Sequence, residues 1–135
     1  MWQLRLSKGG ECDAAPLFDG TNLYLAGVRT AINGKTSSGS LQQVDPATGK
    51  IIWQTGLPGK IIGTPGMDGA GLIAAASYGA RGGANGLYLI DAATGQLLST
   101  ISYGSSSTFA QPVFADNFLI TASQGALGLQ AYTAG

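Results

Sequence analysis

The chain has 135 residues, enough for one domain with a hydrophobic core and too few for two large ones. Hydrophobic residues make up 44% of it and charged residues 10%, which excludes a disordered, solvated segment. Seven basic residues balance seven acidic ones, so no net charge attracts nucleic acid or an anionic membrane. No apolar stretch approaches the roughly 20 residues of a membrane helix, and Met1–Arg5 lacks the apolar core of a secretory signal. We therefore predict no nucleic-acid partner and no membrane span.

An internal repeat is the main signal in the sequence. The segment Val44–Trp53 aligns with Ile90–Ser99 at a shift of 46 residues. A proline followed by an Asp-Gly or Asp-Asn step also recurs, at Pro16 with Asp19-Gly20, Pro65 with Asp68-Gly69, and Pro112 with Asp116-Asn117. These steps favour tight turns between antiparallel strands. A period of 46 to 49 residues is typical of a four-stranded propeller blade.

Short apolar runs between the turn marks predict the strands. In chain order we expect a lone outer strand at 2–7, then strands at 13–18, 22–28, 40–45, 50–56, 61–67, 71–77, 86–91, 96–102, 109–114, 118–123 and 127–132. This is an all-β fold of about three four-stranded antiparallel blade equivalents in a single β-propeller repeat domain, 1–135. Its blade parts are 1–7, 8–56, 57–103 and 104–135.

Three blade equivalents are too few for a closed ring, because closed propellers typically carry about four to eight. Two interpretations follow. Either the chain is the C-terminal piece of a longer propeller protein and its partners are the missing blades, or two copies form a six-bladed homodimer. In the second case each N-terminal strand completes the last blade of the other copy.

Two long connections, 29–39 and 78–85, are predicted as loops on one face of the propeller. Long loops on a rigid scaffold often carry binding residues. The candidate contacts to a protein partner are Arg29, Asn33, Lys35, Arg81 and Asn85. The alternative is that both loops are solvated and bind nothing.

Catalysis is not expected. The sequence contains no histidine, the usual general base and a common metal ligand. Repeated turn positions account for five of the seven carboxylates, at Asp19, Asp45, Asp68, Asp91 and Asp116. The other two, Glu11 and Asp13, are interpreted as solvated charges. We predict no catalytic residue, no cofactor and no metal ligand.

The segment Asp45-x-x-Thr48-Gly49-Lys50-x-x-Trp53 resembles the tryptophan docking motif of the pyrroloquinoline-quinone-like repeat. This repeat occurs in quinoprotein alcohol dehydrogenases and in the propeller lipoprotein of the outer-membrane assembly machinery. In that family the tryptophan stacks against the next blade. The resemblance implies structural blade-docking roles for Trp2, Trp53, Gly49, Gly95, Asp45 and Asp91, while Ser99 stands where a third tryptophan would be.

The same resemblance implies a function and a location. It suggests a non-catalytic propeller-repeat module for protein binding or scaffolding in the bacterial cell envelope, in a periplasmic or extracytoplasmic position. The alternative is a fragment of a quinone-dependent dehydrogenase whose cofactor ligands lie in missing blades. The adjacent cysteines that many of those enzymes carry are lacking here, since the sequence has one cysteine.

Overall fold

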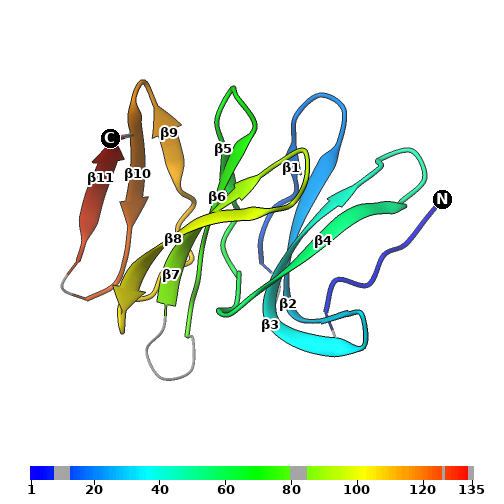
Figure 1. Ribbon diagram of the computed structural model, residues 1–135, viewed down its shortest axis with the longest axis horizontal. Helices are drawn as coiled ribbons and strands as arrows, with labels where there is room; N and C mark the ends of the chain where they lie inside the picture. Colours follow the sequence, from blue (N-terminus) through cyan, green and yellow to red (C-terminus); the bar gives the residue numbers. More distant parts are fainter. Residues whose placement is uncertain (8–12, 80–84, 126, 134–135) are drawn as a thin grey trace.

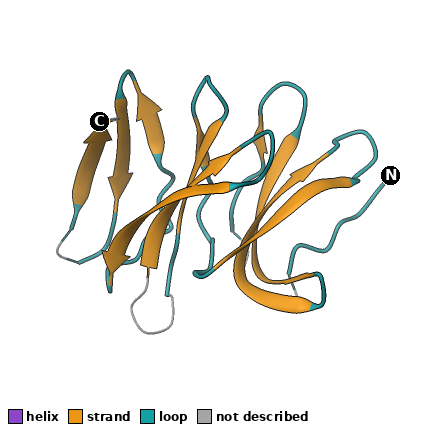
Figure 2. Cartoon of the chain, in the orientation of Figure 1, coloured by secondary structure: helices purple, strands orange, loops and turns teal. Residues whose placement is uncertain are grey.

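The computed structural model describes residues 1–7, 13–79, 85–125 and 127–133. Within these ranges all regular structure is β, with eleven strands in three antiparallel sheets and no helix (Figure 2). The sheets stand side by side in chain order, each with its strands running between the same two ends of the molecule (Figure 1). The predicted all-β fold of partial propeller blades is confirmed.

Each sheet is built from strands that follow one another along the chain. The first sheet contains β1 (Leu17–Phe18), β2 (Leu23–Ile32), β3 (Lys35–Val44) and β4 (Ile51–Leu57). The second contains β5 (Gly66–Met67), β6 (Leu72–Ala76), β7 (Asn85–Asp91) and β8 (Leu97–Gly104). The third contains β9 (Val113–Ala115), β10 (Phe118–Ala122) and β11 (Leu129–Thr133).

The repeated sequence motif forms the same turn twice. Asp45 accepts hydrogen bonds from the backbone N–H of Ala47 and the hydroxyl of Thr48, both at 2.8 Å. Asp91 accepts the backbone N–H of Thr94 at 2.8 Å. Gly49 and Gly95 follow with φ of 72° and 74°, a left-handed conformation that favours glycine. The turn chemistry thus fixes where the third strand of each sheet ends and the fourth begins.

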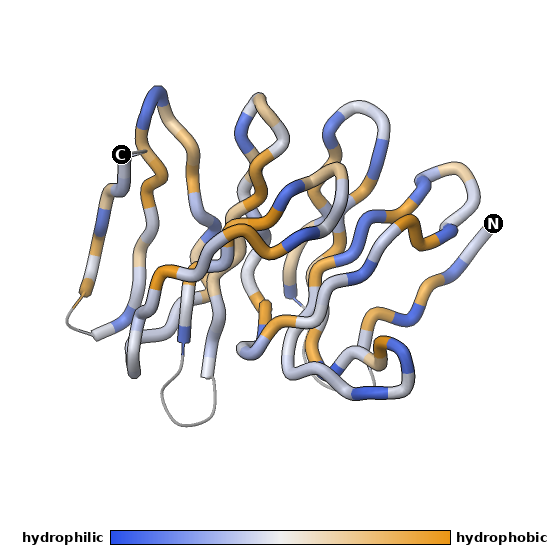
Figure 3. Tube along the Cα trace, in the orientation of Figure 1, coloured by the Kyte–Doolittle hydropathy of each residue, from blue (hydrophilic) through white to orange (hydrophobic). Residues whose placement is uncertain are grey.

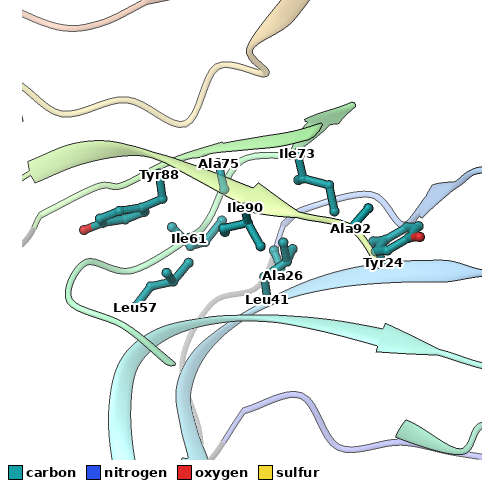
Figure 4. Packing of buried hydrophobic residues seen from close by; sticks show 10 residues of the cluster. All are labelled: Tyr24, Ala26, Leu41, Leu57, Ile61, Ile73, Ala75, Tyr88, Ile90 and Ala92. Carbon is teal, nitrogen blue, oxygen red and sulfur yellow. The ribbon is translucent and has the colours of Figure 1, made fainter. Parts of the chain in front are cut away.

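The core lies between the sheets. Successive residues of a strand point to opposite faces, so Ile73 and Ala75 of β6 pack toward the first sheet while Ala74 and Ala76 pack toward the third. Figure 4 shows the first of these two clusters, which includes the buried Leu41 and Tyr88. Burial on both faces explains why the sequence of this strand shows no alternation of polar and apolar residues.

Glycines allow backbone segments to approach closely at two places where the first, second and third sheets follow one another. A Cβ atom at Gly66 would overlap the carbonyl oxygen of Pro112, which precedes the third sheet. A Cβ atom at Gly39 would overlap the carbonyl oxygen of Gly59 in the same way. In both cases the obstacle is backbone, which cannot rotate out of the way as a side chain can.

The predicted loop at 29–39 is wrong. β2 runs on to Ile32 and β3 begins at Lys35, so the strands meet in a two-residue turn at Asn33-Gly34. Both turn residues have positive φ, 48° and 80°, as a type I′ hairpin requires. Asn-Gly is the strongest short-range signal for such a hairpin, and it outweighs the polar composition that suggested a loop.

The N-terminal strand predicted at 2–7 is also absent, because residues 1–7 have no strand pairing in the structure. The innermost strands are shorter than expected, with two residues each in β1 and β5 and three in β9. The second predicted loop, 78–85, falls mostly outside the described residues, and its last member, Asn85, begins β7.

Candidate binding surfaces

The two tryptophans link successive parts of the chain in the same way. The indole N–H of Trp53 in β4 donates to the carbonyl oxygen of Ala92 in the second sheet at 2.9 Å. Its ring lies directly over Gly95, where a Cβ atom would approach the indole to 2.5 Å, and 6.1 Å from the ring centroid of Tyr24. The motif turn of the second sheet is therefore the platform on which the first sheet docks.

Trp2 repeats this arrangement one unit earlier. Its indole N–H donates to the carbonyl oxygen of Pro46 at 2.9 Å, and a Cβ atom at Gly49 would approach its ring to 2.5 Å. The structure thus brings each predicted docking tryptophan onto a predicted docking glycine. Alanine at either glycine would have to push the indole away.

The turn carboxylates are held as hydrogen-bonded anions. The backbone N–H of Asn22 lowers the pKa of Asp19, and the hydroxyl of Thr48 lowers that of Asp45. The backbone N–H of Thr94 lowers the pKa of Asp91. Burial, assisted by a hydrogen bond to Asp19, raises the pKa of the Tyr24 phenol to about 12. These groups serve the turns, and none is poised to exchange a proton near neutral pH.

The predicted contact residues separate into three groups. Arg29, Asn33 and Lys35 are exposed on the β2–β3 hairpin. Asn85 is 4% exposed and lies beside the Ser77 hydroxyl at 3.3 Å, so its side chain belongs to the interior of the second sheet and cannot reach a partner at the surface. Arg81 lies outside the described residues, as does Glu11, whereas Asp13 is exposed.

A groove of about 700 Å³ opens between the second and third sheets. Its apolar lining is contributed by both sheets, by Leu72, Leu89, Ile101, Phe114, Phe118 and Tyr132. The sequence analysis noted the serine at position 99 but did not predict a groove from it. Ser99 occupies the position of Trp53, so the indole that fills the outer space between the first two sheets has no counterpart at the second junction.

The comparison with protein families agrees with this geometry. A family model for the pyrroloquinoline-quinone-like repeat, described as outer membrane protein assembly factor BamB, matches residues 1–127. The chain belongs to this repeat family. Curated proteins gave no match to the chain.

Membership of the repeat family confirms the resemblance seen in the docking motif and gives the three sheets their identity as propeller blades. Over the described ranges, no helix is long and apolar enough to cross a membrane. The same ranges contain no group of three side chains suited to holding a metal ion.

Ser99→Trp is expected to restore the family's docking residue and to raise the unfolding free energy by about 1 kcal/mol, since it buries an aromatic ring in an apolar groove. Ser99 shares a strand face with Ile101, which lines the groove, so the indole enters it. Urea denaturation measures the change. Thr100→Trp is the control, because Thr100 pairs with Tyr88 and lies on the other face of β8, and it should raise the unfolding free energy less. Equal stability of the two variants would show that position 99 does not face the groove.

Proposed function

We propose that this chain is a non-catalytic propeller-repeat module that binds another protein in the bacterial cell envelope through the β2–β3 hairpin. The observation that carries the proposal is the exposure of Arg29, Asn33 and Lys35 together on one tight hairpin. The description of the matching family model, an outer membrane protein assembly factor, supports a role in the envelope.

The hairpin lies at the basic end of the molecule. The turns at the opposite end carry Asp19, Asp45, Asp68, Asp91 and Asp116, with Lys50 as the cation among them (Figure 1). The hairpin end carries Arg29 and Lys35. The bridge between Lys60 and Tyr78 places Lys60 there as well, and Asp13 lines a pocket together with Tyr78. Figure 3 shows hydrophilic residues in the turns at both ends, with apolar and hydrophilic segments mixed along the strands between them. Among the described residues the two ends thus carry charges of opposite sign, and the basic end suits a partner with acidic side chains.

Arg29 has an unusual backbone conformation that supports a binding role. Its φ is 48° although it lies within β2 and has a bulky side chain. Such a conformation costs on the order of 1 kcal/mol in a residue other than glycine. Strained residues of this kind are concentrated at functional positions, because a side chain that is needed there outweighs the strain.

The double variant Arg29→Gly/Lys35→Gln tests the proposal. Glycine accepts the φ of position 29 without strain, so the variant should fold at least as stably as the original chain. We expect it to capture at least fivefold less of its envelope-protein partners from a bacterial periplasmic extract, quantified by mass spectrometry after cross-linking. Raising the salt concentration should weaken capture by the original chain, since the attraction is between exposed charges.

The matched control is Lys50→Gln at the acidic end, which removes one exposed cation and should leave capture unchanged. Undiminished capture by the double variant, with normal stability, would refute the hairpin as the contact surface. The non-catalytic part of the proposal is supported by two observations. The three carboxylates with lowered pKa, those of Asp19, Asp45 and Asp91, accept hydrogen bonds within their turns. Both tryptophans donate hydrogen bonds to neighbouring motif turns.

A further inference from the structure

Asparagine is a thermolabile residue, and the chain contains two Asn-Gly steps, at Asn33-Gly34 and Asn85-Gly86. In such a step the backbone nitrogen of the glycine can attack the side-chain amide of the asparagine, because glycine has no Cβ atom to crowd the attacking nitrogen. The chain's other two asparagines precede leucine and phenylalanine, whose side chains hinder the attack. The two Asn-Gly steps are therefore the positions where the sequence favours loss of the amide.

The structure leaves the first of these steps open to reaction. Asn33 and Gly34 are exposed, and a Cβ atom at Gly34 would meet nothing within 4 Å. Among the described residues, no group accepts a hydrogen bond from the Gly34 N–H, so the attacking nitrogen is available. Strand pairing stops at Ile32 and Lys35, so the turn can change its dihedral angles without breaking a strand pair. Water, which completes the reaction, has access to the exposed turn.

The second step is protected within the second sheet. Asn85 is 4% exposed, and Gly86 follows it in β7, where it pairs with Ser102 of β8. The Gly86 N–H, which would have to lose its proton before the attack, donates to the hydroxyl of Ser77 at 2.9 Å. Reaction at this position requires part of the sheet to open. The same dipeptide thus occurs in two opposite environments within one chain.

We propose that Asn33 is a deamidation site and that its reaction weakens partner binding by the β2–β3 hairpin, the second part resting on the proposed function. The deprotonated Gly34 nitrogen forms a bond to Cγ of Asn33, and the bond from Cγ to Nδ2 breaks. Nδ2 leaves as ammonia, which carries away the proton that the glycine amide lost. Water then opens the resulting five-membered succinimide, adding OH to a carbonyl carbon and H to the nitrogen. Opening at the side-chain carbonyl gives aspartate, and opening at the backbone carbonyl gives isoaspartate.

Either product changes the hairpin. Aspartate tolerates the φ of 48° at position 33, and Asp-Gly suits the same turn type, so the hairpin persists with a negative charge between Arg29 and Lys35. Isoaspartate adds a carbon atom to the backbone of a two-residue turn, which also disturbs the pairing of Ile32 with Lys35. Both products place a carboxylate where the acidic side chains of a partner approach, and like charges there repel each other.

Peptide mapping of the folded chain tests the site. The chain is incubated at mildly alkaline pH and digested with trypsin, which releases residues 30–35, and tandem mass spectrometry follows both steps. We expect Asn33 to react about tenfold faster than Asn85 or more, since opening a paired strand costs more free energy than opening the turn. In guanidinium chloride, where both steps are unprotected, the two rates should be similar. The rate at Asn33 should rise with pH, because the attacking nitrogen must lose its proton. Equal rates in the folded chain would overturn the assignment.

Two substitutions test the effect on binding. Asn33→Asp supplies the charge at once and should capture about threefold less of the envelope-protein partners than the original chain. Asn33→Gly keeps a dipeptide that suits the type I′ turn but has no side-chain amide, so its capture should not decline during incubation, whereas that of the original chain should. Undiminished capture by Asn33→Asp, where Arg29→Gly/Lys35→Gln loses capture, would overturn the effect on binding. If neither variant lost capture, the proposed function would be refuted together with that effect, and the peptide map would still decide the modification site.

Discussion

Replacing Gly66 by alanine is expected to lower the unfolding free energy by about 3 kcal/mol, at the upper end of what one added methyl group costs in a packed interior. Gly66 is in β5, the innermost strand of the second sheet, and is buried. Its Cβ atom would overlap the Pro112 carbonyl oxygen, and relief would require the second and third sheets to move apart. Urea denaturation followed by circular dichroism measures the loss.

Gly69→Ala is the matched control for this substitution. Gly69 lies three residues further along, in the turn before β6, and a Cβ atom there would meet nothing within 4 Å. Its φ lies outside the left-handed region, so alanine is tolerated there. Alanine also restricts the conformations of the unfolded chain, which should raise the unfolding free energy by up to about 0.5–1 kcal/mol. If the two variants were equally stable, the close approach of the inner strands would be contradicted.

Trp53→Ala should lower the unfolding free energy by roughly 3 kcal/mol, as expected for removal of a well-packed aromatic side chain. The variant loses the hydrogen bond to the Ala92 carbonyl oxygen and the contact of the indole with Gly95 and Tyr24. The hydrogen bond to Ala92 and the contact with Gly95 join the first sheet to the second, so their loss weakens the junction between the sheets and leaves the strand pairing within each sheet intact. The midpoint of urea denaturation reports the change.

Trp53→Phe separates the two contributions. Phenylalanine keeps an aromatic ring over Gly95 but donates no hydrogen bond, so the expected loss is about 1 kcal/mol, mainly that of the hydrogen bond. A phenylalanine variant as unstable as the alanine variant would mean that the N–H and not the ring holds the sheets together. An alanine variant of undiminished stability would contradict the docking role altogether.

Much of the fold could be predicted because turn chemistry is local. Asp45 and Asp91 form their turns with residues that follow within four positions, so the repeat of these turns in the sequence predicts where strands end. The hairpin at Asn33-Gly34 was as local as these turns and could have been predicted from its two residues. The late start of the inner strands is marked locally as well, because β1, β5 and β9 begin directly after Pro16, Pro65 and Pro112, and proline has no backbone N–H to donate to a strand ladder.

The candidate surface was less predictable because its contacts are not local. Arg29 and Lys35 are exposed as expected, but the burial of Asn85 depends on how β7 pairs with strands on either side, which a single segment does not encode. The groove between the second and third sheets lies beside position 99, where serine stands opposite the groove residue Leu89 and the first sheet has Trp53. An absent side chain gives no motif, and its effect becomes visible only when the two neighbouring sheets are placed together.

The connection of each strand to its immediate successor has a consequence for how the chain acquires its shape. In the part of the chain that the structure describes, each sheet is built from strands that are consecutive in the sequence, so loop-closure entropy is small at every step and the first sheet can form before the third has been synthesised. Folding can therefore proceed by addition, one sheet serving as the template for the next. Insertion or loss of a whole repeat would then alter the number of units without disturbing the internal order of those that remain.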